Sequence, residues 1–178
     1  DSYRMGVELV GAYQFNDQLR WDANLTLSRN KISNFTEVLY NYGTNFDEFN
    51  IEETQYEDTD ISFSPNVIGG SQLTYAPFDG FEASLRSKYV GQQYLDNTSN
   101  DNRSIDPYFV NDLRLSYNFG ASSVENVNIS LLVNNILDVE YSSSGYTFGY
   151  AGGEYVVREN YYYPQAGRNF LVALNLRF

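Results

Sequence analysis

Apolar and polar residues alternate with a period of two over most of the chain, and this pattern constrains the fold more than any other feature. Odd-numbered positions from Tyr3 to Phe15 are mainly apolar, whereas the even-numbered positions between them are mainly polar or small. Side chains on a β-strand point alternately to opposite faces, so the pattern predicts strands with one apolar and one polar face. No segment of useful length shows helical periodicity, and the chain is therefore predicted to be all-β.

Seven runs of this kind follow one another along the chain. They cover approximately residues 3–15, 19–28, 61–75, 81–89, 109–119, 127–133 and 169–178. Short connections at 16–18, 76–80 and 120–125 alternate with long ones at about 36–60, 96–106 and 141–166. This alternation is expected when antiparallel strands run up and down one sheet, with turns at one edge and loops at the other.

Charged residues within these strands lie on the face opposite the apolar one. They are Arg4, Glu8, Arg20, Asp22, Glu82, Arg86, Lys88, Asp112, Arg114 and Arg177. A face that mixes both signs of charge is typical of a hydrated barrel lumen, and strands of about 9–11 residues match the thickness of a bilayer. A soluble sandwich or barrel also alternates, but its strands are usually about 5–6 residues long. The pattern therefore favours a transmembrane antiparallel β-barrel.

Aromatic residues make up 17% of the chain, and many of them gather beside the short connections. The positions concerned are Tyr13, Phe15, Trp21, Tyr75, Phe78, Phe81, Tyr117, Phe119 and Phe178. Such a row marks one membrane–water interface, and outer-membrane barrels have short periplasmic turns and longer extracellular loops. We therefore expect the outer membrane of a Gram-negative bacterium, extracellular loops at about 36–60, 96–106 and 141–166, and a periplasmic C-terminus.

Composition excludes several classes of function. The chain has no His and no Cys, so it cannot build a Ser-His-Asp or Cys-His nucleophile system or a His/Cys metal, haem or iron–sulfur site. Its net charge of -12 argues against a nucleic-acid partner, which needs a basic face. We expect no enzyme and no cofactor; a carboxylate-only hydrolase in the loops is the one catalytic alternative.

Seven strands do not close a barrel of this type. Single-chain bacterial barrels have an even number of strands, about eight or more, and an open edge inside lipid leaves backbone groups without partners. The sequence also opens without a recognisable signal peptide. We therefore expect residues 1–178 to be the C-terminal part of one larger transmembrane barrel domain whose earlier strands lie upstream.

Four stretches resemble the C-terminal end of TonB-dependent outer-membrane receptors. They are Tyr89–Asp96, Asp106–Leu113, Val133–Tyr141 and Tyr163–Phe178. The resemblance implies that these are the last seven strands of a barrel of about 22 strands that encloses a plug. It also implies import of a nutrient with energy supplied through TonB, which would bind the missing N-terminal region. Iron chelate, cobalamin, glycan and peptide all stay open as the nutrient.

The last strand carries a row of apolar residues that the resemblance identifies with the outer-membrane assembly signal. The row is Phe170, Val172, Leu174, Leu176 and Phe178. The alternative is a lipid-facing strand that ends on an interfacial aromatic. Expected partners are outer-membrane lipid, the rest of the barrel and its plug, TonB, the assembly machinery, and an extracellular ligand or surface lipoprotein. The rival function is a non-transporting barrel that acts as an adhesin or a structural, partner-binding protein.

The long connections supply candidate ligand residues. Residues 36–60 hold eight acidic residues and no base, with aromatic residues between them. The candidates are Tyr40, Tyr42, Asp58 and Asp60 here and Tyr155, Arg158 and Tyr161 in the last connection. Stacking rings and carboxylates suit a cationic or sugar-like ligand, and carboxylate oxygens also suit a divalent cation. The alternative is a solvated loop whose charge keeps it soluble.

Overall fold

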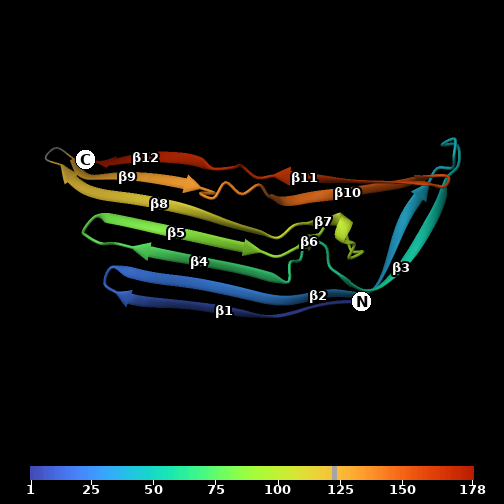
Figure 1. Ribbon diagram of the computed structural model, residues 1–178, viewed down its shortest axis with the longest axis horizontal. Coiled ribbons are helices and arrows are strands. Elements are labelled where there is room, and N and C mark those ends of the chain that lie inside the picture. Colours follow the sequence, from blue (N-terminus) through green and yellow to red (C-terminus); the bar gives the residue numbers. More distant parts are fainter. Residues whose placement is uncertain (122–123) are drawn as a thin grey trace.

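The protein is built almost entirely of β-strands in a computed structural model that describes residues 1–121 and 124–178 (Figure 1). Seven long strands form one curled antiparallel sheet in which neighbours along the chain are neighbours in space. They are β1 (Ser2–Asn16), β2 (Leu19–Asn41), β4 (Val67–Tyr75), β5 (Phe81–Val90), β8 (Tyr108–Ala121), β9 (Val124–Asn134) and β12 (Asn169–Arg177). The predicted all-β, up-and-down arrangement is confirmed.

The register of the sheet confirms the two faces. One row across the strands is apolar throughout and reads Tyr13, Trp21, Leu73, Leu85, Leu113, Val133 and Phe170. The adjacent row is polar up to β8 and reads Gln14, Arg20, Thr74, Ser84, Arg114, Leu132 and Leu171. A shift of one residue in any strand would mix the two faces, so the alternation itself specifies the register.

The long connections contain more strand than the sequence predicted. Segment 36–60 forms a hairpin in which β3 (Asn50–Asp60) pairs with the outer half of β2, and segment 141–166 forms the hairpin of β10 (Ser142–Gly152) and β11 (Tyr155–Pro164). Apolar alternation does not reveal β3, because acidic residues occupy both of its faces and its pairing with β2 rests on backbone hydrogen bonds.

The remaining connection folds compactly. Its elements are β6 (Gln93–Tyr94), the 3-10 turn η1 (Asp101–Arg103) and β7 (Ser104–Ile105). The strand predicted to begin at Ile61 is wrong in its first part: residues 61–66 form a turn with Phe63 at φ 52°, and β4 begins at Val67. The φ value is left-handed, which interrupts the alternating side-chain directions that the prediction assumed.

Short turns occupy one edge of the sheet, which we call the turn edge; the opposite edge, with the hairpins, is the loop edge (Figure 1). Gly80 closes the β4–β5 turn at φ 82°, where a Cβ would collide with the Asn118 carbonyl oxygen. The short connection predicted at 120–125 is narrower than expected, because β8 runs to Ala121 and β9 begins at Val124; Ser122 and Ser123 lie outside the described residues. Aromatic pairs gather at the turn edge, with ring centroids 5.2 Å apart for Phe78–Phe81.

The apolar face of the sheet has no second layer over it in the described chain. Val7, Leu9 and Leu174 are more than half exposed, at 59%, 56% and 60%. The small buried core lies instead on the polar face near the loop edge, where Val90, Tyr108 and Val110 pack against Val139 and Tyr141. An apolar surface of this extent marks contact with a membrane or another protein.

The sheet is open at both sides. β1 pairs only with β2 and β12 pairs only with β9, so each leaves one row of backbone groups unpaired within the described residues.

Among those residues, no helix is long and apolar enough to span a membrane.

Candidate functional site

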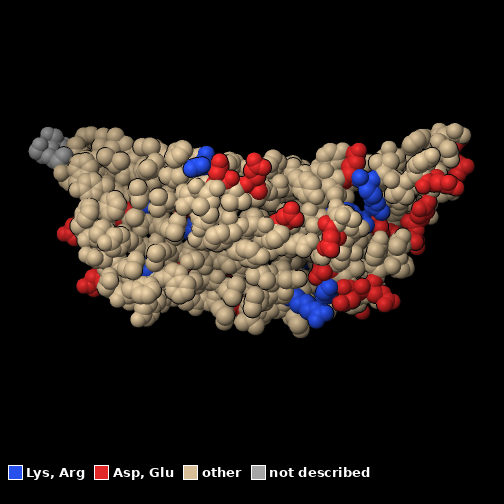
Figure 2. Space-filling model, in the orientation of Figure 1, with Lys and Arg blue, Asp and Glu red and all other residues tan. Residues whose placement is uncertain are grey.

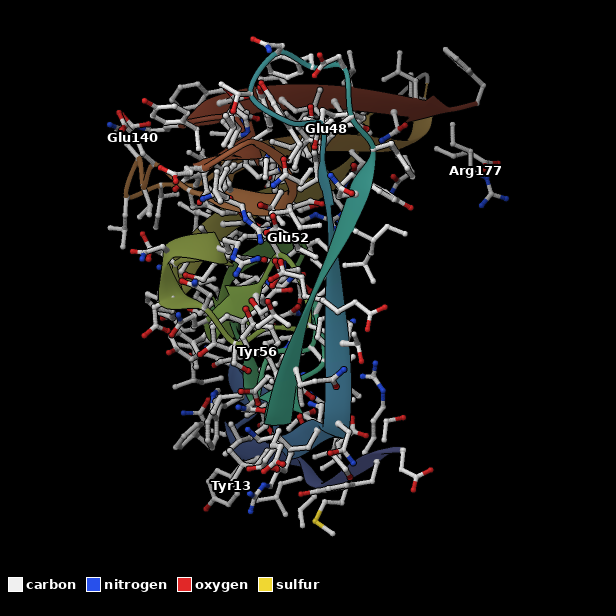
Figure 3. The ribbon with its side chains drawn as sticks, turned by 90° about the vertical axis from the view of Figure 1, so that its right-hand side faces the viewer. Tyr13, Glu48, Glu52, Tyr56, Glu140 and Arg177 are labelled. Carbon is white, nitrogen blue, oxygen red and sulfur yellow. The ribbon has the colours of Figure 1, made fainter. Side chains whose placement is uncertain are left out.

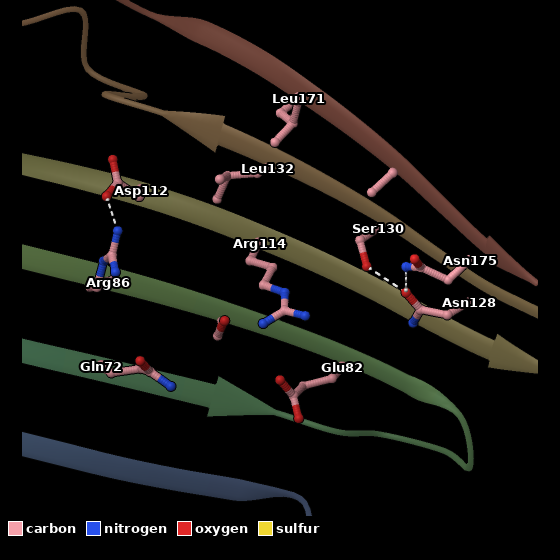
Figure 4. Close-up of a pocket in the computed structure, with 12 residues that line it drawn as sticks. Gln72, Glu82, Arg86, Asp112, Arg114, Asn128, Ser130, Leu132, Leu171 and Asn175 are labelled. Atoms are coloured by element: carbon pink, nitrogen blue, oxygen red, sulfur yellow. Dashed lines mark hydrogen bonds and ion pairs between the residues drawn. The ribbon is translucent and has the colours of Figure 1, made fainter.

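The polar face is hollowed by a cavity of about 420 Å³ (Figure 4). Arg86 on β5 donates to Asp112 on β8 at 2.8 Å, and Asp112 also accepts the backbone N–H of Asn135 at 3.0 Å. Glu82 and Arg114 line the same hollow without an ion-pair partner in the described chain. The hollow therefore presents charges of both signs to any group that lies against the concave face of the sheet.

A buried ion network joins the three connections at the loop edge. Glu37 on β2 accepts from Arg103 of η1 at 2.7 Å and from Arg158 of β11 at 2.6 Å through the same oxygen. Arg103 also donates to Asp96 at 2.7 Å, and the Tyr56 hydroxyl donates to the other oxygen of Glu37 at 3.0 Å. Two carboxylates and two guanidinium groups balance, which is what allows these charges to be buried.

Burial and hydrogen bonding oppose each other in this network. Burial of Glu37 disfavours its charged form, but hydrogen bonds from Arg158 and Arg103 outweigh this, and the pKa of Glu37 lies below its ordinary value. Burial and the bond to Glu37 both raise the pKa of Tyr56. Glu37 therefore stays ionised and Tyr56 stays protonated at neutral pH, so the network acts as a structural clamp.

Asn41 joins the tips of the two hairpins. Its side-chain oxygen accepts the N–H groups of Gly43 and Gly153, both at 3.0 Å. Its side-chain nitrogen donates to the Gly153 carbonyl at 3.0 Å, and the Tyr42 N–H donates to the Ala151 carbonyl at 2.9 Å. Figure 1 shows the β2–β3 hairpin reaching across to the tip of β10 and β11.

The structure distributes the sequence-predicted ligand residues over separate places. Tyr40 and Tyr42 lie at the hairpin tip, whereas Asp58 and Asp60 lie at the other end of β3 beside Lys31, which pairs with Asp60 at 3.2 Å. Arg29 is 3.6 Å from Asp58. These two acids are therefore partly neutralised, and they are not part of the tip.

The three candidates on β11 also separate. Tyr155 begins the strand at the tip and is 78% exposed. Arg158 belongs to the buried network, and Tyr161 stacks on Tyr146 with ring centroids 4.9 Å apart. Their role in binding a ligand stays a prediction.

Cation capture by the acidic segment finds no support in its geometry. Across residues 1–121 and 124–178, no three acidic side chains come together in a group that could hold a metal ion. Acidic residues nevertheless dominate the surface at the loop edge (Figure 2).

The proposed assembly-signal residues form one exposed row on β12 and at the end of the chain. Phe170, Val172, Leu174, Leu176 and Phe178 range from 49% to 81% exposed. They are accessible on an edge strand, and their recognition by assembly machinery stays a prediction.

Sequence reasoning missed most of the buried network. Glu37 and Tyr56 belong to a segment with many acidic and aromatic residues, and their spacing does not indicate that these two form an internal contact. Arg103 carried the available signal, because it is the only basic residue between Lys88 and Arg114 and lies between acidic residues. A lone cation among acids in a loop is a candidate for an internal ion pair.

A curled sheet of long strands, apolar outside and charged inside, with turns at one edge and hairpins at the other, defines the wall of an outer-membrane-type β-barrel. A family model described as TonB dependent receptor-like, beta-barrel matches residues 1–136. The chain belongs to this family of TonB-dependent receptors. Receptors of the family are outer-membrane proteins of Gram-negative bacteria.

Solved structures share the fold. The siderophore receptor PiuA from Acinetobacter baumannii matches 98% of this chain with a TM-score of 0.72 at 18% identity. The ferric-catecholate import receptor Fiu from E. coli K12, in its open form, matches 98% with a TM-score of 0.63 at 16% identity. The ferric yersiniabactin uptake receptor FyuA from Yersinia pestis matches 96% with a TM-score of 0.58 at 23% identity. This chain covers 22%, 21% and 22% of those chains, or about a fifth of their length.

Proposed function

We propose that this chain is the C-terminal part of the barrel of a receptor that imports a nutrient across the outer membrane. The observation that carries the proposal is the family match over residues 1–136. The open sheet supports it, because β1 and β12 each keep one unpaired side on which further barrel strands would close. The rest of the barrel, the plug and the TonB-binding segment would belong to the remainder of the receptor.

The two faces of the sheet suit different partners. Lipid would cover the apolar face, and the plug would meet the charged hollow around Arg86, Asp112 and Arg114. The turn edge would face the periplasm together with the C-terminal Phe178, and the loop edge would face outward. The row from Phe170 to Phe178 would be read by the assembly machinery, and a ligand or surface lipoprotein would approach the hairpins.

The cargo is the finer part of the proposal. Among the proteins of similar fold, PiuA is a siderophore receptor, Fiu imports a ferric catecholate and FyuA takes up ferric yersiniabactin. Ferric chelates are therefore the class to assay first, followed by cobalamin, glycans and peptides.

The test begins with the intact mass of the native polypeptide that carries Val133–Asp138, taken from outer-membrane fractions. A chain several times longer, with a plug region upstream, is expected. Uptake of radiolabelled ferric chelates, cobalamin, an oligosaccharide and a peptide is then compared in cells with the receptor, without it, and without TonB. Cargo that enters only when both are present supports the proposal. Surface binding without entry for all four would show a non-transporting barrel instead.

A further inference from the structure

The two hairpin tips together carry a surface of aromatic rings, which we call the tip surface. It consists of Tyr40, Tyr42, Phe46, Phe49, Phe148 and Tyr150. Phe46, Phe49 and Phe148 are 63%, 64% and 56% exposed, although they lie at the far end of the sheet from the aromatic row of the turn edge. The membrane interface at the turn edge therefore does not explain them.

The rings form one continuous group across both hairpins. Centroids are 5.3 Å apart for Tyr40–Phe49 and 6.0 Å for Tyr42–Phe49, both within the β2–β3 hairpin. Tyr150 of β10 lies 6.4 Å from Tyr42 and 6.1 Å from Phe46, and Phe148 continues the group at 5.9 Å from Tyr150. Neither hairpin could present this surface alone.

The backbone holds the rings in place at a cost in strain. Asn41 fixes the two tips to each other, and Phe46 adopts φ 58°, a left-handed conformation that bulky residues rarely take. Gly152 leaves the space that the Phe46 ring needs, since a Cβ there would lie 3.3 Å from its Cζ atom. Strained residues held by their surroundings are concentrated at ligand clamps and functional sites.

Carboxylates without basic partners surround the rings. They are Asp47, Glu48, Glu52, Glu53 and Glu154, and none of them forms an ion pair within the described chain. Segments 32–60 and 141–157 contain no Lys or Arg. Figure 3 shows Glu48 near the top of the hairpin and Glu52 below it, and Figure 2 shows the acidic edge.

We propose that the tip surface binds a basic segment of another protein. Guanidinium and ammonium groups stack on aromatic faces and pair with carboxylates, and the tip offers both within one surface. Anionic ligands such as the phosphates of lipopolysaccharide meet five uncompensated negative charges and are repelled. This interaction goes beyond nutrient uptake and is independent of which cargo the barrel imports.

The experiment uses the full-length receptor in detergent and a fluorescent arginine–glycine repeat peptide as the probe. Binding is measured by anisotropy, with a glutamate–glycine peptide, maltoheptaose and lipopolysaccharide as competitors. The double variant Phe49→Ala, Phe148→Ala removes two exposed rings without changing charge, and we expect it to weaken binding about tenfold. Tyr146→Ala is the matched control, because that ring stacks on Tyr161 outside the tip surface.

A second pair of variants tests the charges. Asp47→Asn with Glu53→Gln should weaken peptide binding severalfold and reduce its dependence on salt, whereas Asp17→Asn with Asp79→Asn at the turn edge should not. Equal affinity of the ring variant and the wild type would overturn the proposal, because binding would then be nonspecific charge attraction. Absence of peptide binding would overturn the proposal, and direct binding of labelled maltoheptaose or lipopolysaccharide to the same receptor would then assign the surface to a glycan or a lipid. A wild-type receptor that imports its cargo but does not bind the peptide would refute this proposal and leave the proposed transport intact, so the two failures are distinguishable.

Discussion

Replacing Glu37 by glutamine tests whether the ion network clamps the hairpins. The substitution keeps the shape of the side chain but removes the charge that Arg103 and Arg158 contact at 2.7 and 2.6 Å. The side chains of Glu37 and Arg103 are 13% and 8% exposed, and breaking such a buried pair costs about 3–5 kcal/mol. Arg158 is 31% exposed and regains water, and Arg103 keeps Asp96, so we expect a loss of about 2–3 kcal/mol.

Hydrogen exchange in the full-length receptor shows which segments lose stability when Glu37 is replaced. The sheet keeps its ladder of hydrogen bonds, so the loss should appear as easier opening of the β2–β3 and β10–β11 hairpins. Their amides should exchange about 30- to 150-fold faster, while amides of β5 and β8 should not change. Glu53→Gln is the control, because Glu53 has no ion pair in the described residues and should change stability by less than about 0.5 kcal/mol.

Equal exchange in the two variants would refute the clamp. A double variant, Glu37→Gln with Arg158→Ala, refines the result, since the freed guanidinium is then absent. Its loss should be smaller than the sum of the two single losses if the two side chains interact as the structure shows.

Three further predictions follow from the same structure. The pKa of Glu37 is lower in the folded state than in the unfolded state, where it is about 4.3. The stability that Glu37 contributes should therefore be fully present above a pH of about 4.3 and be lost only as the pH falls through the folded pKa. Distances between spin labels on the two hairpin tips should stay fixed at about pH 6, and their distribution should broaden in strong acid. Leu85→Arg places a charge in the apolar row and should destabilise the folded receptor in lipid by about 2–4 kcal/mol, whereas Ser84→Arg on the polar face should cost far less; equal urea midpoints would contradict the assignment of faces. Gly80→Ala introduces a Cβ against the Asn118 carbonyl at a left-handed φ, and we expect it to lower the free energy of unfolding by about 1–3 kcal/mol. The loss should appear as a lower unfolding temperature in detergent. Gly11→Ala is the control and should be nearly neutral, because nothing lies within 4 Å of a Cβ at that position.

The main sheet was predictable because the alternation of apolar and polar residues within each strand specifies which face each side chain occupies. Alternation assigns Leu73, Leu85 and Leu113 to one face and Arg86 and Asp112 to the other, and the observed register places each set in one row. The short turn at residues 76–80 was equally readable from its Pro and Gly.

The hairpins and their contacts were not predictable in the same way. β3 pairs through its backbone and carries acids on both faces, so hydropathy gave no signal for it. Glu37 and Arg158 meet across more than a hundred residues of chain, and no local pattern encodes such a contact. The candidate ligand residues lie in separate places in the structure, and their role in binding stays a prediction.

The joint that Asn41 makes between the two hairpins limits how this part of the receptor can be altered by evolution or by design. Surface loops usually accept insertions and deletions independently of one another. Here, one residue added to or removed from the outer part of β2 would shift Asn41 away from Gly153 of the other hairpin. Length changes in either hairpin therefore have to be matched in the other, and a loop-grafting experiment should transplant both hairpins together.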